Sequence, residues 1–598
     1  MLIGASRRAP AWPRALPEPC LHADGWVSPS TTDCFSTPQM PVSSPLTEPR
    51  GTITDALGRQ PFAAVVRRIG RVAAQEGIEA YLVGGAVRDA LLGRLTTDLD
   101  FVTVGEGTGI ALAQALADRL EGARAAHVYE NFGTAAVRVP APVEGDDDLV
   151  LEFVAARKES YRSESRKPTV EAATLADDLR RRDFTVNALA AALAPERFGA
   201  LIDPFDGRAD LKRQLLRTPL DPADTFEDDP LRMIRAARFA AQLGFDVDAE
   251  ARRAMQQHAE RVEILARERI TDELQKIVAA DVPSIGFKLL EEAGLLTHFL
   301  PELSALTGTE RRRGESHKDN FLHTLQVLDQ LAERVSGRPV DDDEHGTRWL
   351  RWAALLHDIG KAETKRFQNG NWTFHGHEHV GARMVEGVFR RLELPLDWRA
   401  DYVEKLVLMH HRPADLASDD VTDSAVRRLL FDAGEDLGDL MTLVRADVTS
   451  ANPRRRARHQ DAYDRVEEKM RAVEEKDRLR NFEPPLGGEE IMEALGIEEG
   501  VAVGIVKENV REAILDGEIE NEHAAARRYM DEIADEALRR SALFEEMQRR
   551  LEGPEQRALG AIKEVLFFGE VPQPHDAAVQ RLLAVKDEAL ADEAEERG

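Results

Sequence analysis

The sequence has little cysteine, no long apolar run and no excess of positive charge, and each of these absences excludes a class of protein. Its two cysteines, Cys20 and Cys34, both lie near the N-terminus of the 598 residues. A disulfide framework is therefore excluded, and a reducing, cytoplasmic location is expected. No apolar run approaches the roughly 20 residues that cross a bilayer, so a soluble protein with no membrane partner is expected.

The formal net charge of −29 argues against general affinity for nucleic acid, because phosphate binding requires a cationic surface. Net charge is nevertheless an average over the whole surface. Three basic clusters interrupt the acidic sequence, namely Arg180 to Arg182, Arg311 to Arg313, and Arg454 to Arg456 with Arg458. Contacts with phosphate groups are therefore expected to be local.

A chain of this length exceeds a single hydrophobic core and predicts several domains. Residues 1–52 are rich in Pro, Ser and Thr and predict a disordered extension; initiation at Met40 is the alternative. Between 53 and 200, helical patterns alternate with short apolar runs such as "AYLVGG" and "LVLEFV", which indicates an α/β domain. Beyond 200, apolar residues recur every three or four positions. The expected fold class is α+β multidomain, with a small α/β head followed by all-α domains.

The stretch "YLVGGAVRDALLGRLTTDLDF" combines features that suit a metal-bound triphosphate. Gly84 and Gly85 let the backbone approach a ligand closely, and Arg88, one turn into the following helix, can clamp a phosphate oxygen. Asp98 and Asp100 are two residues apart on a predicted strand, so their side chains share a face. Two carboxylates on one face are what a pair of Mg²⁺ ions requires for phosphoryl transfer.

A third carboxylate for such a site usually comes from a neighbouring strand, and Glu152 in "LVLEFV" is the best candidate. Each feature alone has a structural explanation, because a Gly-Gly turn or an isolated D-x-D is common in loops and at strand edges. Their order and spacing together favour catalysis, with Asp98, Asp100 and Glu152 as the predicted catalytic carboxylates.

These motifs resemble those of the class II CCA tRNA nucleotidyltransferase and poly(A) polymerase family, which has a polymerase-β-like head. "RRRDFTVNALA" is similar to the ribose-reading motif of the family, which implies that Arg182 contacts the nucleotide and Asp183 the ribose hydroxyl. "EDDPLRMIRAARF" resembles the base-reading motif, which implies roles for Asp229 and Arg232, with Arg235 one turn further along the helix. A carboxylate and a guanidinium can read the donor and acceptor edge shared by cytosine and adenine.

The polar stretch "ARKESYRSESRKP" from Ala156 resembles the flexible loop that lies between the catalytic strand and the ribose motif in this family. In the family this loop accompanies the ability to add the terminal A. Its presence therefore implies addition of CCA, or of the terminal A, to the tRNA.

A second group of polar residues lies between 306 and 460, in "FLHTL", "LLHDIGK", "FHGHEHVGA", "LMHHRP" and "VRADVTS". Grouped imidazoles and carboxylates suit divalent transition metals, and open coordination positions suit activation of water. The order of these motifs resembles the HD phosphohydrolase superfamily in a form with enough ligands for two metals. The implied ligands are His323, His357, Asp358, His377, His410, His411 and Asp447.

Three further residues of this region have open roles. His375 and His379 are expected to line the site or to contribute nothing. Lys361, which follows the His-Asp pair, can contact a substrate phosphate or can be a charge placed near a helix C-terminus, where the helix dipole favours cations.

The resemblance implies a nucleotidyltransferase head over 53–200, a base-reading and RNA-binding neck over 201–305, an HD phosphohydrolase domain over 306–460 and a helical tail over 461–598. The expected activity is addition of CCA, or its terminal A, to the 3′ acceptor end of tRNA from CTP and ATP. Mg²⁺ is expected in the head, and a divalent transition metal or Mg²⁺ in the HD domain. The alternatives are a poly(A) polymerase of the same family and an HD nucleotide phosphohydrolase with an inactive head. The HD motifs and the acidic C-terminus favour tRNA.

Overall fold

The computed structural model of the chain describes residues 53–550 except for 121, 130–132, 141–147, 163–164, 313–314, 317–318, 342–345, 418–421, 451 and 478–484. The predicted disordered extension over 1–52 lies outside the described residues. Among the helices that are described, none combines the length and the apolarity that a membrane span requires.

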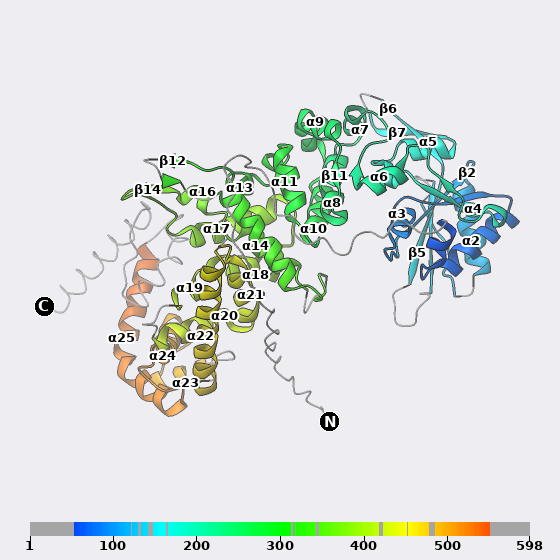
Figure 1. Cartoon of the computed structure of the whole chain (residues 1–598). Coiled ribbons are helices and arrows are strands. Elements are labelled where there is room, and N and C mark those ends of the chain that lie inside the picture. The colour runs from blue at the N-terminus through cyan, green and yellow to red at the C-terminus, as the bar shows by residue number, and fades with distance from the viewer. Residues whose placement is uncertain are drawn as a thin grey trace, which may run out of the picture. The chain divides into compact units, whose positions relative to one another are not determined.

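The head is built on a mixed seven-stranded sheet (Figure 1). Across the sheet the strands are β3 (His127–Tyr129), β4 (Thr134–Val139), β5 (Leu149–Ala155), β2 (Leu99–Val104), β1 (Glu79–Val83), β8 (Ala190–Ala192) and β9 (Leu201–Ile202). β2 and β5 are parallel, and the other neighbouring strands are antiparallel. The helices that cover the sheet are α1 (Ile53–Gly58), α2 (Ala63–Gln75), α3 (Gly85–Leu92) and α4 (Thr108–Arg119).

The register of the parallel pair places two acidic residues side by side. Phe101 of β2 is paired with Phe153 of β5, and their rings stack in the core at 4.9 Å. Because side chains alternate between the two faces of a strand, the adjacent pair, Asp100 and Glu152, lies on the opposite face. Asp98 was predicted to lie on the same strand, but it precedes β2, since the ladder with β5 begins only at Leu99.

The polar stretch that the sequence predicts as a loop is a β-hairpin in this structure. β6 (Arg157–Arg162) and β7 (Ser165–Ala172) pair in antiparallel fashion. The hairpin follows β5 after a single residue, so it continues from the strand that carries Glu152.

The neck is helical, as the three- to four-residue spacing predicts. It comprises α6 (Gly207–Arg213), α7 (Pro222–Asp228), α8 (Leu231–Leu243), α9 (Ala249–Gln257), α10 (Arg267–Val278), α11 (Ser284–Glu292), α12 (Leu296–Phe299) and α13 (Pro301–Ser304), with a 3-10 turn at Ala259–Ile264. The end of the head adds α5 (Leu175–Arg180) and 3-10 turns at Thr185–Asn187 and Pro195–Arg197. Helix α8 is central, because it packs against both α10 and α11 through buried residues such as Met233 and Ala237. Its arginines, Arg232, Arg235 and Arg238, line a cavity that is described below.

The HD region consists of α14 (Asn320–Arg334), α15 (Arg348–Leu356), α16 (Lys361–Thr364), α17 (His377–Arg391), α18 (Trp398–Met409), α19 (Arg412–Asp415), α20 (Asp423–Ala433), a 3-10 turn at Gly434–Asp436 and α21 (Leu437–Asp447). Trp352 of α15 and Phe389 of α17 are fully buried and lie edge to face within its core. Most of the predicted ligands lie at helix ends. His377 begins α17, His410 follows α18 and Asp447 ends α21.

Beyond the head, the structure contains short strands that the all-α prediction omits. They are β10 (Leu215–Leu216) with β11 (Asp246–Val247), β12 (Arg311–Arg312) with β13 (Glu315–Ser316), and β14 (Arg366–Gln368) with β15 (Asn371–Thr373). The last hairpin turns at Asn369 and Gly370, which both have positive φ. An Asn-Gly pair between apolar residues is a strong hairpin signal, and the sequence contains it.

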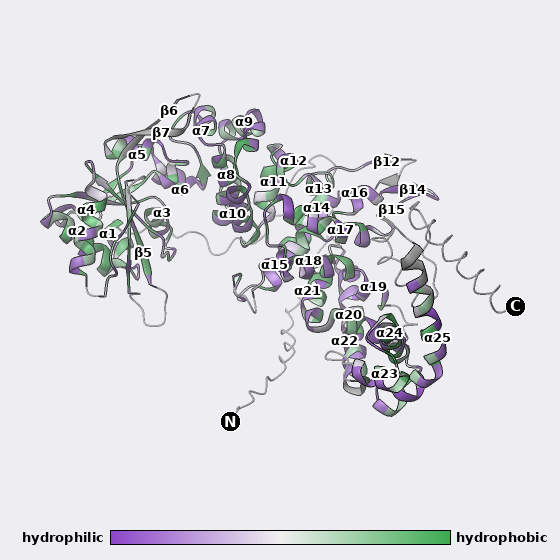
Figure 2. Ribbon diagram, turned by 180° about the vertical axis from the view of Figure 1, so that it is seen from behind, coloured by the Kyte–Doolittle hydropathy of each residue, from purple (hydrophilic) through white to green (hydrophobic). Residues whose placement is uncertain are grey.

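α22 (Pro453–Asp477) packs into the main hydrophobic core through residues such as Tyr463 and Met470. The three helices after it, α23 (Gly488–Leu495), α24 (Val501–Asp516) and α25 (His523–Arg550), form a separate hydrophobic core. Ile491, Val506 and Met530, one from each of the last three helices, belong to this core. Figure 2 shows the corresponding mixture of hydrophobic and hydrophilic residues along these helices. The expected fold class, a mixed-sheet head followed by mostly helical domains, is confirmed.

Candidate functional site

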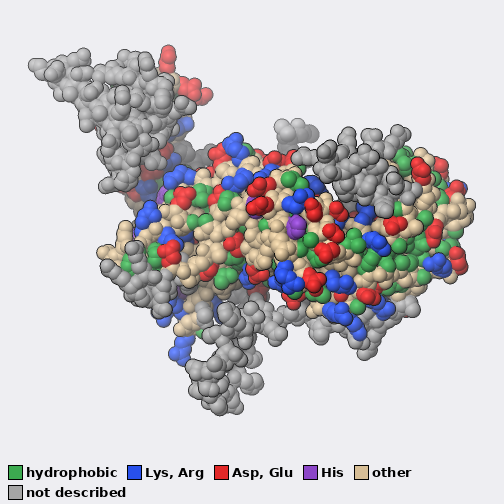
Figure 3. Space-filling view, turned by 90° about the horizontal axis from the view of Figure 1, so that it is seen from above, with side chains coloured by type: hydrophobic (Ala, Val, Ile, Leu, Met, Phe, Trp, Pro, Cys, Tyr) green, Lys and Arg blue, Asp and Glu red, His purple; other side chains and the backbone are tan. Residues whose placement is uncertain are grey.

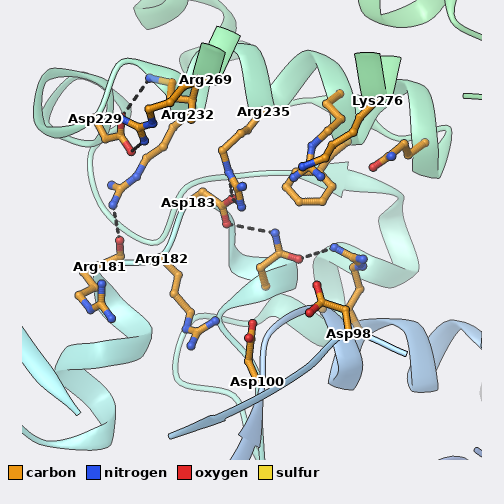
Figure 4. Close-up of a pocket in the computed structure, with 17 residues that line it drawn as sticks. Asp98, Asp100, Arg181, Arg182, Asp183, Asp229, Arg232, Arg235, Arg269 and Lys276 are labelled. Carbon is orange, nitrogen blue, oxygen red and sulfur yellow. Dashed lines mark hydrogen bonds and ion pairs between the residues drawn. The ribbon is translucent and has the colours of Figure 1, made fainter. Parts of the chain in front are cut away.

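A cavity of about 510 Å³ is lined by residues of the head and of helices α8 and α10 (Figure 4). Nine predicted residues line it: Gly85, Arg88, Asp98, Asp100, Arg182, Asp183, Asp229, Arg232 and Arg235. Gly84 and Glu152 do not belong to its lining. The cavity therefore collects residues from three sequence motifs, of which the first and the third lie more than a hundred positions apart.

The acid pair in the cavity carries negative charge that Arg182 offsets only in part. Burial, and after it the charge of Asp98, raises the pKa of the Asp100 carboxyl to about 6, and Glu152 contributes in the same direction. Glu152 itself is exposed on the neighbouring strand. Carboxylates that repel one another in a partly buried site are suited to a divalent cation, which would supply the missing positive charge.

The glycine turn brings the backbone close to an arginine. Gly84, the N-cap of α3, has φ +70° and ψ −130°, a conformation that side chains other than hydrogen disfavour. A β-carbon at this position would lie 2.7 Å from Nη1 of Arg182. Arg182 is itself held by the fully buried Asp178, which also pairs with Arg181. The turn therefore accommodates a cation that points toward Asp100 (Figure 4).

A chain of hydrogen bonds joins Arg88 of α3 to Arg235 of α8. Arg88 donates from Nη1 to the side-chain oxygen of Asn187 at 2.7 Å, and Asn187 donates to Asp183 at 3.0 Å. Asp183 in turn accepts from Nε of Arg235 at 2.8 Å. Although burial opposes ionisation, Arg235 and then Asn187 lower the pKa of Asp183 to about 2. Asp183 is therefore an ionised anchor between head and neck.

The predicted base-reading residues lie at the other end of the cavity. Arg232 donates to the backbone carbonyl of Arg181 at 2.6 Å, and Asp229 lies 3.4 Å from Nη2 of Arg269. Both side chains remain partly exposed toward the cavity. Asp229 and Arg232 therefore present a carboxylate and a guanidinium to the same cavity.

Sequence reasoning missed several lining residues. They are Arg181, Asn187, Leu231, Arg238, Phe239, Gln242, Arg269 and Lys276. Arg238 continues the three-residue spacing of Arg232 and Arg235 along α8, so helical periodicity could have found it. Arg269 and Lys276 come from α10, and only tertiary packing brings that helix to the site.

A second polar centre lies in the HD region, where three predicted ligands converge. The Nε2 atom of His323 lies 3.0 Å from the Asp447 carboxylate, and that of His357 lies 3.8 Å from it. One ligand atom from each of these three residues falls within 4.8 Å of the others. This first group has the composition and spacing of a site for a divalent metal.

Another three ligands form a second group with the same spacing, namely His377, His410 and His411. Asp358 faces both groups. Its Oδ2 atom is 3.4 Å from both His323 and His357, whereas its Oδ1 atom is 3.3 Å from His377. The arrangement fits two metal ions with Asp358 between them.

Backbone carbonyls orient the buried imidazoles. The Nδ1 atom of His357 lies 2.8 Å from the Ala354 carbonyl, and that of His377 lies 2.9 Å from the carbonyl of Phe374. His410 has the equivalent contact with a carbonyl one turn earlier. These contacts direct each Nε2 atom toward the centre, which is how metal-binding histidines are usually held.

Two buried atoms at the centre, Nε2 of His357 and Oδ1 of Asp358, have polar neighbours at 3.3–3.4 Å but form no hydrogen bond within the described structure. Unpaired buried polar atoms are costly, and metal coordination would satisfy both. Burial also lowers the pKa of His410 well below its usual value, which favours the neutral form that binds metal. The residues therefore fit divalent metal ions.

The residues with open roles now have positions. Lys361 lies 2.6 Å from Asp358 and, together with His375, lines a cavity of about 390 Å³ that reaches His377 and His411. His379 points away, with 65% of its side chain exposed and Glu378 as its partner. Lys361 and His375 therefore line the cavity beside the ligand groups, and His379 does not.

Gly360 allows the two ligand groups to approach each other, and we expect Gly360→Ala to damage both fold and centre. A β-carbon there would lie 2.1 Å from the His377 carbonyl oxygen and 2.6 Å from the Gly381 nitrogen, both of which are backbone atoms. We expect the free energy of unfolding to fall by about 1–3 kcal/mol, measured by denaturant titration, and bound metal per chain to fall in elemental analysis.

Gly387→Ala is the matched control, because this glycine lies in α17 with no atom within 4 Å of its β-carbon position. It should leave stability unchanged or raise it slightly, since alanine favours a helix. Equal effects of the two substitutions would contradict the close approach at Gly360.

Comparisons with known proteins match this geometry. Residues 80–217 match the model of the poly A polymerase head domain, and residues 319–452 match that of the HD domain. Residues 244–306 match the model described as a probable RNA and SrmB- binding site of polymerase A. Families of the first two kinds generally depend on divalent metals.

Two curated relatives and one solved structure illustrate the similarity. The chain is 36% identical over 448 residues to the A-adding tRNA nucleotidyltransferase of Deinococcus radiodurans, covering 74% of this chain and 92% of the relative. It is 37% identical over 353 residues to the multifunctional CCA protein of Alkalilimnicola ehrlichii, covering 57% and 75%. The Thermotoga maritima CCA-adding enzyme, solved in complex with tRNA, aligns with a TM-score of 0.51 at 20% identity, over 81% of this chain and 99% of the other. The last similarity concerns the fold alone.

Proposed function

This chain belongs to the tRNA nucleotidyltransferase family, and we propose on that premise that it completes the 3′ end of tRNA with CCA, or with its terminal A, from CTP and ATP. A single observation carries the proposal. One cavity holds the acid pair of the head, the arginines that suit a triphosphate, and the carboxylate and guanidinium that suit a base edge. The reaction is assigned to the cytoplasm, as the lack of a disulfide framework suggests.

In the proposed reaction the 3′-hydroxyl of the RNA attacks the α-phosphate of the incoming nucleotide, and pyrophosphate leaves. Arg88 and Arg182 hold phosphate oxygens, because both guanidinium groups line the cavity that also contains the acid pair. Asp183 receives the ribose hydroxyl while Arg235 holds its carboxylate in place. These contacts align the reacting groups, which is the main contribution that a protein makes to phosphoryl transfer.

Asp98 and Asp100 are the residues that would hold Mg²⁺, with Glu152 beside them on the parallel strand. The bound ions would supply activation of the 3′-hydroxyl and neutralisation of the charge on the transferring phosphate. Asp229 and Arg232 receive the edge of cytosine or adenine in place of a template. Arg269 positions Asp229 through their ion pair.

The HD region adds a metal-dependent phosphohydrolase activity to this proposal. Its two ligand groups and Asp358 would hold two divalent ions, transition metals or Mg²⁺, which would supply a metal-activated water. Lys361 and His375 lie at the mouth of the centre, where they can contact phosphate oxygens of a substrate.

The proposal predicts a defined product pattern. Purified protein and Mg²⁺ are incubated with three tRNA transcripts that end before CCA, after C and after CC, with CTP and ATP supplied singly and together. Products are resolved at single-nucleotide length. We expect each transcript to grow to CCA and stop, or A alone to be added to the transcript that ends in CC.

Other patterns would refute this function. A long ladder of A residues on any RNA would make the protein a poly(A) polymerase. No addition to any transcript, together with release of phosphate from model esters, would leave the HD region as the active part.

A further inference from the structure

The cluster Arg454, Arg455, Arg456 and Arg458, here called the arginine patch, has no role in the sites described so far. All four side chains are exposed. In the part of the chain that the structure describes, none of the four forms an ion pair. The chain as a whole is strongly acidic, and acidic and basic side chains are interspersed on the face drawn in Figure 3. Four unpaired cations within five positions therefore stand out.

The stability of α22 does not explain the arginine patch. The patch occupies the first turns of this 25-residue helix, and the first turn contains no acidic residue. Cations near a helix N-terminus are disfavoured by the helix dipole, typically by about 0.3–1 kcal/mol each. The side chain of Asn452 already accepts from the backbone amides of Arg454 and Arg455, at 3.0 and 3.3 Å. These two backbone amides are therefore occupied, and a ligand of the arginine patch would be bound by the guanidinium groups.

The structure ties the arginine patch to the HD centre from both sides. On one side, Thr449 contacts Nδ1 of His323 at 2.9 Å, and only a few residues separate it from α22. On the other side, Gln460 and Arg445 exchange hydrogen bonds at 3.0 and 3.2 Å. Arg445 lies two residues before the ligand Asp447, and Gln460 lies two residues after Arg458. The patch is thus anchored beside the ligands of the first metal group.

The chemistry of the arginine patch favours a chain of phosphates. Guanidinium groups bind phosphate oxygens in bidentate fashion and remain charged at any physiological pH. An α-helix rises about 1.5 Å per residue. Along the axis of α22, Arg458 therefore lies about 3 Å from Gln460, and Arg454 lies about 9 Å from it. A phosphate-containing polymer can therefore contact the patch while its end lies in the HD centre.

We propose that Arg454, Arg455, Arg456 and Arg458 form a docking surface for the phosphate backbone of an RNA strand whose 3′ end enters the HD centre. This inference rests on the proposed phosphohydrolase function and specifies its substrate as the end of an RNA. The chain would then contact RNA at two different places, the arginine patch and the nucleotide-addition cavity, which has its own arginines.

The test compares two substrates that carry the same reacting group. One is a short single-stranded RNA that ends in a 2′,3′-cyclic phosphate, and the other is 2′,3′-cyclic AMP. The full-length protein carries all four substitutions R454A, R455A, R456A and R458A. One control has lysine at the same four positions, which keeps the charge, and another has R465A and R471A further along α22.

We expect KM for the RNA to rise about tenfold or more in the alanine variant, with kcat and both parameters for cyclic AMP unchanged. The slope of log affinity against log salt should become shallower by about 2–3, because each lost single-strand contact removes about 0.7. The lysine variant should retain most of the affinity, and the control pair should behave as wild type. The proposal would be overturned if KM of the alanine variant changed equally for the RNA and for cyclic AMP, or changed for neither.

Two further measurements separate this proposal from the functions on which it rests. Addition to the transcript ending in CC should keep its KM for tRNA; a rise there without a change in hydrolysis would assign the patch to the head and overturn the proposal. If the wild type hydrolyses neither substrate, the phosphohydrolase function is refuted. RNA affinity measured by fluorescence anisotropy then tests the docking surface by itself. Unchanged affinity in the alanine variant, or equal affinity of the wild type for polyglutamate, overturns the docking surface.

Discussion

Asp100→Asn is expected to lower kcat for nucleotide addition by about a thousandfold, which corresponds to about 4 kcal/mol of lost transition-state stabilisation. Asp100 and Asp98 are the carboxylates that line the cavity at the proposed metal position, and an amide there is a much weaker ligand for Mg²⁺. Single-turnover addition of one nucleotide to a tRNA transcript, with saturating Mg²⁺, measures the effect.

Stability should not account for this loss. Burial and the charge of Asp98 already disfavour ionisation of Asp100 in the fold, so a neutral side chain should leave the free energy of unfolding unchanged or higher. Asp118→Asn, at an exposed position in α4, is the matched control and should retain full activity. Hydrolysis at the HD centre should also be unaffected. Retention of more than a tenth of the addition rate would exclude Asp100 as a metal ligand.

Asp358→Ala is expected to abolish hydrolysis at the HD centre, by about a thousandfold or more, and to remove both metal ions. The reason is geometric, because the two carboxylate oxygens of Asp358 face different ligand groups. His323→Ala should deplete the first group and His377→Ala the second, each leaving about one metal per chain. Elemental analysis of the purified holoenzymes, beside hydrolysis of 2′,3′-cyclic AMP, measures both effects.

His379→Ala is the control for this series, because His379 lies in the same motif but its side chain is mostly exposed. It should retain metal and activity. Nucleotide addition should persist in Asp358→Ala, since the head cavity contains none of the HD ligands. Loss of a single metal in Asp358→Ala would show that this carboxylate does not lie between two ions.

Much of the candidate site was predictable because its residues lie in short, ordered motifs. Gly85, Arg88 and the acid pair occur within one turn-helix-strand unit, so local chain geometry alone brings them near one another. The same holds for Asp229 and Arg232, which flank the start of α8. The hairpin β14–β15 could also have been predicted, since its Asn-Gly turn is a local signal in the sequence.

Other features depend on contacts between distant segments. Asn187 links Arg88 to Asp183 only because a 3-10 turn packs behind α3, and Arg269 reaches Asp229 only because α10 packs against α8. The position of Asp98 ahead of β2 is set by where pairing with β5 begins. Periodicity carries no information about such pairings.

The sequence by itself determined the family, the order of head, helical neck and HD region, and the chemical types of the side chains at both centres. Only the tertiary structure decided which side chains share a cavity, that Asp358 lies between two ligand groups, and that Gln460, which follows the arginine patch, contacts Arg445. The physical reason is that motifs record local spacing, whereas shared burial, hydrogen bonds and ion pairs arise from packing between segments far apart in the chain.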